Sequence, residues 1–447
     1  MWVVYKLLHN PGDWSMTLYD TKPIWIVISS LCWASVALGL NSPALRWGQQ
    51  LLTPTNDTIF GWMIADSNDG IYIAVLREPP EDSESTFPTQ GFFLLKYNQD
   101  GDPLWSKQLG KSDAGESLHV VVDGLAADGR ENVYVYGYTH SLPGQKRQGE
   151  NDVFLAKYNH TGSRQWVRQL GTPQHDVCTG LAADANDHIY ITGYTYGDFA
   201  KANAGTCDIF VAAYDPTGTC LWRDQFGTNA DDRAMDLRLG NENDLYLCGT
   251  TVGSLGRNNN GQNDILVARY ERNGKQRWVA QYGTPAEDNA VCMEIGEQGQ
   301  IYVSGRTLGN LAFHRAHRGY GDAFTIRMSD TGEILWKRQY GSRGWDKTFH
   351  MARFMDGSGD VLVGGCQYPN GICQAFSRRY SPEGKLVWTQ EFRKRNLKGP
   401  GGTCGRAVAI DKDNNCYQAG GTQADNWATN NGTRNVFIVR FDGALEK

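Results

Sequence analysis

Aspartate residues recur at fixed intervals along this chain, and their carboxylates are the groups that could carry acid–base or cation chemistry. One series comprises Asp176, Asp232, Asp288 and Asp346, and a second comprises Asp152, Asp208, Asp264 and Asp322. Carboxylates gathered on one face could bind cations or act as general acids and bases. Because both series recur at the same interval, a structural role is favoured, in which each side chain accepts backbone N–H groups in a turn.

Two other patterns suggest metal ligands. The segments D-x-N-D-G at 66–70 and D-x-D-N-N at 411–415 resemble calcium loops, but neither reaches the full ligand series with its closing glutamate. Calcium therefore stays an alternative, and no cofactor is predicted. His314 and His317 lie three residues apart in the insertion 307–321, but no third ligand is apparent. No metal site is predicted.

Catalytic signatures are missing from the chain. It has no G-x-S-x-G, no P-loop and no H-E-x-x-H. Most of its ten cysteines are expected to be small buried side chains, although Cys366 with Cys373 and Cys404 with Cys416 are close enough in sequence to pair. No catalytic residue is predicted, and an enzyme is the less favoured interpretation.

The elements that position these residues belong to a repeat marked by seven tryptophans: Trp47, Trp105, Trp166, Trp222, Trp278, Trp336 and Trp388. Six of them follow a glycine by four residues, in variants of Y-D-x-x-G-x-x-x-W. A period of roughly 56 residues is typical of arrays and propellers.

Each unit predicts four short strands. In the third unit these are 176–184, 188–194, 208–214 and 219–226, with apolar alternation and a D-P-T-G hairpin turn. A tyrosine recurs in the second strand, for example Tyr190 and Tyr246, and it is expected to pack one sheet against the next. Such sheets bury both faces when they stack around an axis.

The chain ends complete the count. The strand around Trp47 has no preceding hairpin partner, and the strand 435–441 is not followed by a tryptophan strand. The N-terminal strand is therefore predicted to complete the C-terminal blade, leaving no open edge. This predicts an all-β, seven-bladed β-propeller of four-stranded blades over residues 43–447, with first strands near 59, 118, 176, 232, 288, 346 and 404.

The segments NDVFLAKYNHTGSRQWVRQLGT and HIYITGYTYG resemble the bacterial seven-bladed β-propeller repeat, or SBBP, family, roughly over residues 43–443. The resemblance implies exported or surface-associated proteins without assigned chemistry. The hairpin also resembles the tryptophan-docking motif of quinoprotein dehydrogenases, whose eight blades and cofactor cap are not found here.

Residues 1–42 form a separate N-terminal segment whose apolar run, 23–40, predicts a cleaved export signal. An uncleaved membrane anchor and a structural apolar segment are the alternatives, and membrane contact is expected only if residues 23–40 stay uncleaved. Periplasmic or extracellular localisation follows. The net charge is −6, and acidic and basic residues are interspersed along the chain. The sequence therefore predicts no basic face of the kind that binds nucleic acid.

The units differ most in the loops after the second strands, which are long, dissimilar and expected on one face of the ring. Function concentrates in such loops. The residues predicted to contact a ligand are Arg147, Tyr196, Phe199, Arg257, His314, His317, Arg318, Tyr320 and Arg393. The favoured function is a non-enzymatic scaffold that binds a protein or surface glycan. The alternatives are a lyase, hydrolase or quinoprotein-like oxidoreductase with a site in the central funnel, and a structural part of an envelope assembly.

Overall fold

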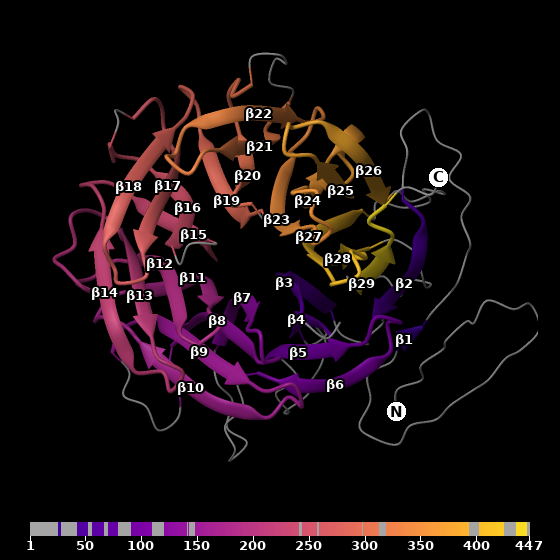
Figure 1. Cartoon of the computed structure of the whole chain (residues 1–447), viewed down its shortest axis with the longest axis horizontal. Coiled ribbons are helices and arrows are strands. Elements are labelled where there is room, and N and C mark those ends of the chain that lie inside the picture. The colour runs from indigo at the N-terminus through magenta and orange to yellow at the C-terminus, as the bar shows by residue number, and fades with distance from the viewer. Residues whose placement is uncertain are drawn as a thin grey trace, which may run out of the picture.

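The strands of this protein form seven antiparallel sheets around a central axis (Figure 1). The structure is a computed structural model that describes residues 26–27, 43–51, 56–66, 70–78, 91–109, 120–140, 142, 148–240, 244–256, 259–296, 298–312, 319–392, 402–423 and 435–444. It confirms the predicted all-β, seven-bladed propeller with four-stranded blades.

Six blades follow chain order, and their first strands lie nearest the axis (Figure 1). Blades one to three comprise β3 (Asn56–Ala65), β4 (Ile71–Glu78), β5 (Gly91–Tyr97) and β6 (Pro103–Gln108); β7 (Val120–Ala127), β8 (Val133–Thr139), β9 (Asp152–Tyr158) and β10 (Arg164–Leu170); and β11 (Asp176–Ala183), β12 (Ile189–Thr195), β13 (Asp208–Tyr214) and β14 (Cys220–Phe226). Blades four to six comprise β15 (Asp232–Leu239), β16 (Asp244–Thr251), β17 (Asp264–Glu271) and β18 (Gln276–Tyr282); β19 (Asp288–Ile295), β20 (Ile301–Thr307), β21 (Asp322–Met328) and β22 (Ile334–Tyr340); and β23 (Lys347–Arg353), β24 (Val361–Gln367), β25 (Gln374–Tyr380) and β26 (Leu386–Phe392), with the 3-10 turn η1 (Pro369–Gly371) after β24.

The seventh blade joins the two ends of the chain. Its strands are β27 (Thr403–Ile410), β28 (Cys416–Thr422), β29 (Asn435–Phe441) and β2 (Leu45–Leu51), and β2 pairs antiparallel with β29. The predicted ring closure by the N-terminal strand is confirmed. A two-residue strand, β1 (Ile26–Val27), pairs with the far edge of β2. The rest of the apolar run 23–40 lies outside the described residues, and no described helix is long and apolar enough to cross a membrane.

The hydrophobic core lies between blades rather than within them. Each of its seven clusters combines residues of two neighbouring blades, as where Tyr190 of blade three packs with Leu237 and Leu266 of blade four. The recurring second-strand tyrosines occupy these interfaces, as predicted. A single blade therefore has no core of its own, and each interface depends on the next.

The seven tryptophans link each blade to the following turn. Every indole N–H donates to a backbone oxygen of the next blade, from Trp47 to Gln99 at 2.9 Å through to Trp388 to Gly443 at 3.0 Å. Only Trp388 is fully buried, at 1% exposure, whereas the other six are half-buried. They act as hydrogen-bonded bridges across the blade junctions more than as core residues.

The glycine of the repeated turn meets two demands. Gly274 has a φ of 89°, which favours glycine, and a Cβ placed there would lie 2.8 Å from the Trp222 ring of the preceding blade. Gly384 stands in the same relation to Trp336. The Y-D-x-x-G-x-x-x-W pattern therefore encodes a contact between units as well as a turn.

Candidate functional site

Loops after the second strands lie beside the connections between blades, and together they form one face of the ring. The Tyr196 N–H donates to the His175 oxygen at 2.9 Å, the Val252 N–H to Asp231 at 3.0 Å, and the Leu308 N–H to Glu287 at 2.8 Å. We call this face, built from the loop residues 196–207, 252–256, 259–263, 308–312 and 319–321 and the connections 171–175, 227–231, 283–287 and 341–346, the variable face.

The recurring aspartates on this face are turn caps, as the sequence favoured. Asp176 accepts the Thr172 N–H at 2.6 Å, and Asp208 accepts the Ala204 N–H and the Gln225 amide, both at 3.0 Å. Asp411 of the calcium-like D-x-D-N-N segment accepts the N–H groups of Asp413 and Asn415 at 3.0 and 2.9 Å. These carboxylates are committed to holding turns in shape.

Three of the nine predicted contact residues lie in the described part of the chain. Phe199 is only 4% exposed and stacks on Phe210 with ring centroids 4.4 Å apart, so its assignment to a ligand surface is corrected to a core role. Tyr196 is half-buried and accepts a hydrogen bond from Arg233 at 3.0 Å. Tyr320 is 69% exposed. The other six, Arg147, Arg257, His314, His317, Arg318 and Arg393, lie outside the described residues.

Tyr320 belongs to an exposed aromatic pair. Its ring lies at 16° to that of Trp345, with centroids 6.2 Å apart, and Trp345 is 48% exposed. The backbone holds the pair together, because the Tyr320 N–H donates to Gly344 at 3.2 Å and the Asp346 N–H donates to Gly321 at 2.9 Å. Two large rings are thus presented to solvent on a rigid support.

Arg306 contacts the Trp345 ring of this pair, and Lys347 lies close enough to Arg306 and Arg406 to be affected by both charges. The Arg306 guanidinium lies 4.8 Å from the centre of the Trp345 ring, and Lys347 and Arg406 each lie 4.2 Å from the centre of the Phe349 ring. Burial, and then the charges of Arg406 and Arg306, lower the pKa of Lys347 to about 8. Arg306 also pairs with Glu287 at 3.2 Å. We call Arg306, Tyr320, Trp345, Lys347, Phe349 and Arg406 the aromatic–cation cluster.

The cluster occupies places that other blades fill differently. Tyr320 stands two residues before the aspartate that opens the third strand, and in blades two, three and four this position holds Glu150, Thr206 and Gln262. Trp345 stands directly before the aspartate that precedes the next first strand, and the corresponding residues after blades two, three and four are His175, Asp231 and Glu287. In blade two the corresponding residues are Glu150 and His175, whose side chains are in contact and form an ion pair when the histidine is protonated. Sequence reasoning missed Trp345, although it is a tryptophan outside the sevenfold series at a place where other units are polar.

The innermost strands of blades two to seven share a second site of variation. Each has a β-bulge at the same register, and the bulged residues are Asp123, Thr179, Met235, Val291, Phe349 and Arg406. Bulges re-aim side chains and are common beside functional sites. Phe349 and Arg406 thus reach the aromatic–cation cluster from bulges in neighbouring blades.

Asp123 is the acidic member of this series. Burial raises its pKa to about 7, and its Oδ2 atom is buried and makes no hydrogen bond within the described structure. It lies near enough to Tyr138 and Tyr194 for its charge to help raise the pKa of both phenols, behind the larger effect of burial. A carboxyl that titrates near neutrality can serve as a general acid or base.

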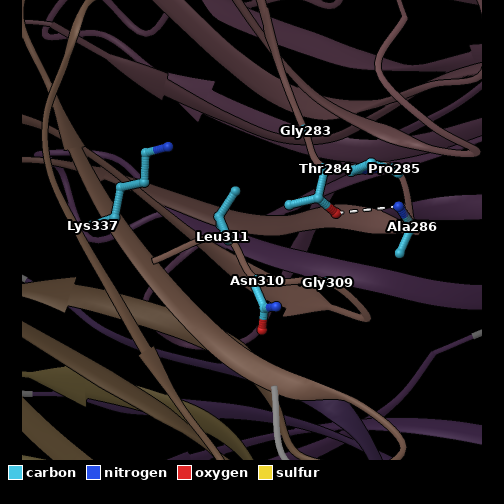
Figure 2. A pocket seen from close by; sticks show the side chains of 8 residues that line it. All are labelled: Gly283, Thr284, Pro285, Ala286, Gly309, Asn310, Leu311 and Lys337. Atoms are coloured by element: carbon cyan, nitrogen blue, oxygen red, sulfur yellow. Dashed lines mark hydrogen bonds between the residues drawn. The ribbon is translucent and has the colours of Figure 1, made fainter. Parts of the chain in front are cut away.

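A pocket of about 510 Å³ lies where the connection from blade four to blade five meets the residues that follow β20 (Figure 2). Its lining is Gly283, Thr284, Pro285, Ala286, Gly309, Asn310, Leu311 and Lys337. The Thr284 hydroxyl is engaged, because it donates to Asp288 at 2.7 Å and accepts the Ala286 N–H at 3.2 Å. Much of this lining is backbone or apolar, so the pocket presents less recognition chemistry than the aromatic–cation cluster.

Comparisons with known proteins match the architecture. Over part of its length the chain is similar to an uncharacterized WD repeat-containing protein of Acanthamoeba polyphaga mimivirus (24% identity, 43% of this chain) and to the regulatory protein FlaEY of Caulobacter vibrioides (26% identity, 44% of this chain). The matches span only 16% and 21% of those two proteins.

Solved structures with a similar fold include Raptor from Chaetomium thermophilum (TM-score 0.51, 9% identity, covering 88% of this chain and 29% of that one) and the polysaccharide lyase Uly1 (TM-score 0.50, 7% identity, covering 90% and 100%). At such identities the likeness concerns the fold alone. The model of the SBBP family, described as a beta-propeller repeat, matches residues 165–200. The expected resemblance is confirmed there: this chain is a seven-bladed β-propeller that carries an SBBP beta-propeller repeat.

Proposed function

We propose that this protein is an exported, non-enzymatic scaffold that binds an acidic glycan through the aromatic–cation cluster of its variable face. The observation that carries the proposal is the exposed, stacked pair Tyr320 and Trp345, with Arg306 over the Trp345 ring. Lys347 and Arg406 over the neighbouring Phe349 ring add two further cations. Export is supported by the apolar run 23–40 and by the SBBP repeat.

The chemistry of the cluster favours sugars with negative charges. Exposed aromatic faces offer flat apolar surface on which the C–H face of a sugar ring can stack. Guanidinium groups match carboxylate and sulfate oxygens in a two-pronged geometry, and an ammonium group adds a point charge. The whole chain carries a net charge of −6 and would repel an acidic polymer at long range. Binding of such a polymer would therefore depend on the local positive charge of this cluster.

The test is calorimetric titration of the full chain with a soluble polyuronate and with a neutral polysaccharide of similar length. We expect saturable binding of the polyuronate, at least about ten-fold weaker binding of the neutral polymer, and a further loss in Trp345→Ala. Leu335→Ala is the matched control, because Leu335 is 53% exposed on blade five but is the second residue of β22, near the opposite face. Equal binding of both polymers, or a partner captured only among proteins, contradicts the proposal.

A second candidate is an enzyme that acts on the same class of polymer near the axis. It is favoured by Asp123, whose pKa of about 7 suits proton transfer. Uronate polymers are cleaved by β-elimination, which leaves an unsaturated product with ultraviolet absorbance. Release of that product by the wild type and its loss in Asp123→Asn would support the enzyme; binding without turnover supports the scaffold.

A further inference from the structure

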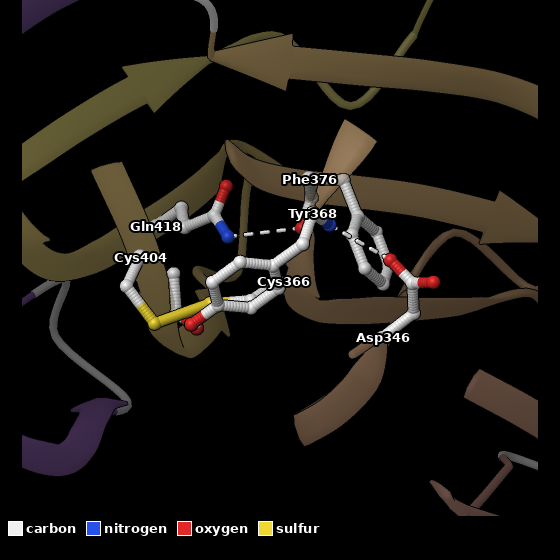
Figure 3. Close-up of a disulfide and its surroundings, with 7 residues drawn as sticks. Asp346, Cys366, Tyr368, Phe376, Cys404 and Gln418 are labelled. Carbon is white, nitrogen blue, oxygen red and sulfur yellow. Dashed lines mark hydrogen bonds between the residues drawn. A yellow bond between two sulfur atoms is a disulfide. The ribbon is translucent and has the colours of Figure 1, made fainter. Parts of the chain in front are cut away.

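Three cysteine sulfurs meet at the junction of blades six and seven. The sulfur atoms of Cys366, Cys373 and Cys404 all lie within 4.8 Å of one another. Cys366 and Cys404 form a disulfide with Cα atoms 5.5 Å apart, which links β24 to β27 (Figure 3). Neither of the pairs suggested by sequence proximity, Cys366 with Cys373 or Cys404 with Cys416, is the one formed, because the ring brings the start of β27 beside the end of β24.

The third thiol is held against this disulfide by the backbone. Cys373 precedes β25, is half-buried and stands outside the disulfide. The Thr403 N–H donates to the Cys373 oxygen at 2.9 Å, which ties the residue before Cys404 to Cys373. A Cβ on the adjacent Gly402 would lie 2.8 Å from the same oxygen, so glycine permits this close approach.

We propose that these residues form an exchangeable disulfide site, in which Cys373 attacks Cys366 and releases Cys404. The Cys373 thiol loses its proton, its thiolate forms a bond to the Cys366 sulfur as the Cys366–Cys404 bond breaks, and the released Cys404 thiolate takes up a proton. One disulfide replaces another, so the step requires neither oxidant nor reductant. The proposal is independent of glycan binding.

The charges around the cluster support exchange. Lys347 is the cross-strand partner of Cys366 in the β23–β24 register, and Arg406 follows Cys404 by two residues on β27. Nearby cations stabilise a thiolate, which is both the attacking and the leaving species in this reaction. Two of the three sulfurs are bonded to each other in the structure, which leaves Cys373 as the one member of the group that could supply a thiolate. The geometry therefore points to exchange and not to a metal site.

Exchange would move a covalent link without opening the ring. The existing disulfide spans two blades, whereas a Cys366–Cys373 disulfide would lie within the β24–β25 connection of blade six. Contacts between the blades remain, because Gln418 of blade seven donates to the Phe376 oxygen of blade six at 2.9 Å (Figure 3). Gln418 also accepts from the Ser377 hydroxyl of blade six at 2.9 Å. The reaction therefore releases the closing blade from a cross-link and leaves its non-covalent packing in place.

The experiment is thiol trapping on the full chain under non-reducing conditions. The protein is incubated with N-ethylmaleimide for increasing times, quenched in acid, and cleaved with chymotrypsin, which can cut after Tyr368 between Cys366 and Cys373. Mass spectrometry then identifies the labelled cysteines and the linked peptides. We expect labelled Cys404 together with a Cys366–Cys373 disulfide to accumulate in the wild type.

Four variants sharpen the result. In Cys373→Ser, Cys404 should stay unlabelled. In Cys404→Ser, Cys366 and Cys373 should pair when oxidised glutathione is supplied as the oxidant. Lys347→Gln should slow labelling of Cys404 by about three- to ten-fold, since the thiolate fraction falls. Cys220→Ser, at an exposed cysteine of β14, should change nothing at this site. Labelling of Cys373 alone in the wild type at all times overturns the proposal, whatever the variants show.

Discussion

The ring of Tyr320 lies nearly parallel to that of Trp345, in the place where the side chains of Glu150 and His175 meet in blade two. Both pairs join a loop after a second strand to the connection that enters the next blade. The two blades thus present different side chains on the same backbone framework. The fold does not require aromatic residues at these two positions.

This equivalence predicts that blade five can take the residues of blade two. The double variant Tyr320→Glu, Trp345→His should keep its unfolding free energy within about 0.5 kcal/mol of the wild type, as for other exposed substitutions. Its affinity for a polyuronate should fall about ten- to a hundred-fold, because both stacking surfaces are lost. Calorimetry and denaturant unfolding measure the two quantities. A large loss of stability with binding intact would reverse the roles assigned to this pair.

Trp47 should matter for stability in the way that Trp345 does not. Trp47→Ala removes the hydrogen bond to the Gln99 oxygen and the edge contact with Tyr417 at 6.2 Å, both at the junction of the closing blade with blade one. We expect a loss of about 2–4 kcal/mol in the free energy of unfolding. Trp345→Ala is the control and should cost under about 0.5 kcal/mol. Equal costs in urea titrations would show that ring closure does not depend on this bridge.

Binding of an acidic glycan should weaken as pH rises through about 8. Lys347 has its pKa lowered from 10.5 to about 8, so its amine is charged below that pH and neutral above it. Arg306 and Arg406, which lower that pKa, stay charged throughout. We expect about a ten-fold loss of affinity between pH 7 and pH 9.5, since one charged donor is lost. Lys347→Arg should abolish this dependence, and its persistence in that variant would assign it to another group.

His350 should make the fold sensitive to acid. Burial, and then the charge of Arg238, lower its pKa from 6.5 to about 4, and its Nδ1 atom lies 2.8 Å from the Val408 oxygen. Between pH 6.5 and 4 the unfolded chain binds a proton that the folded chain does not, so stability falls as pH decreases, by up to about 3 kcal/mol. His350→Gln should flatten this part of the stability curve relative to the wild type. Parallel curves for the two proteins would contradict the assignment.

The repeat made the fold predictable, and departures from it limited prediction of the site. A tryptophan equivalent to Trp105 recurs at every blade junction, and a tyrosine equivalent to Tyr190 recurs at most of them. Their spacing was therefore enough to predict the strands, the number of blades and the closure of the ring. The aromatic–cation cluster instead combines residues that are far apart in sequence, such as Arg306 and Arg406, whose charges both act on Lys347. Their proximity depends on how blades five, six and seven are stacked. Phe199 shows the converse, because a residue in a variable loop can still turn inward to fill the core.

The cysteines failed prediction for a related reason. Distance along the chain favoured Cys366 with Cys373, whereas the observed partner of Cys366 is Cys404, 38 residues away. In a ring, the closest residues to one blade belong to the next blade. Sequence proximity underestimates such contacts.

The closure of blade seven by β2 also decides how the ring would respond to mechanical load. Tension applied through the chain ahead of residue 43 would act first on the two-residue pairing of β1 with β2 and then on β2, which β29 holds. Peeling β2 away would expose one edge of one blade while six blades kept their pairing. The Cys366–Cys404 bond would fasten the damaged blade to its neighbour, so a pulled molecule would fray at one strand before it unwound.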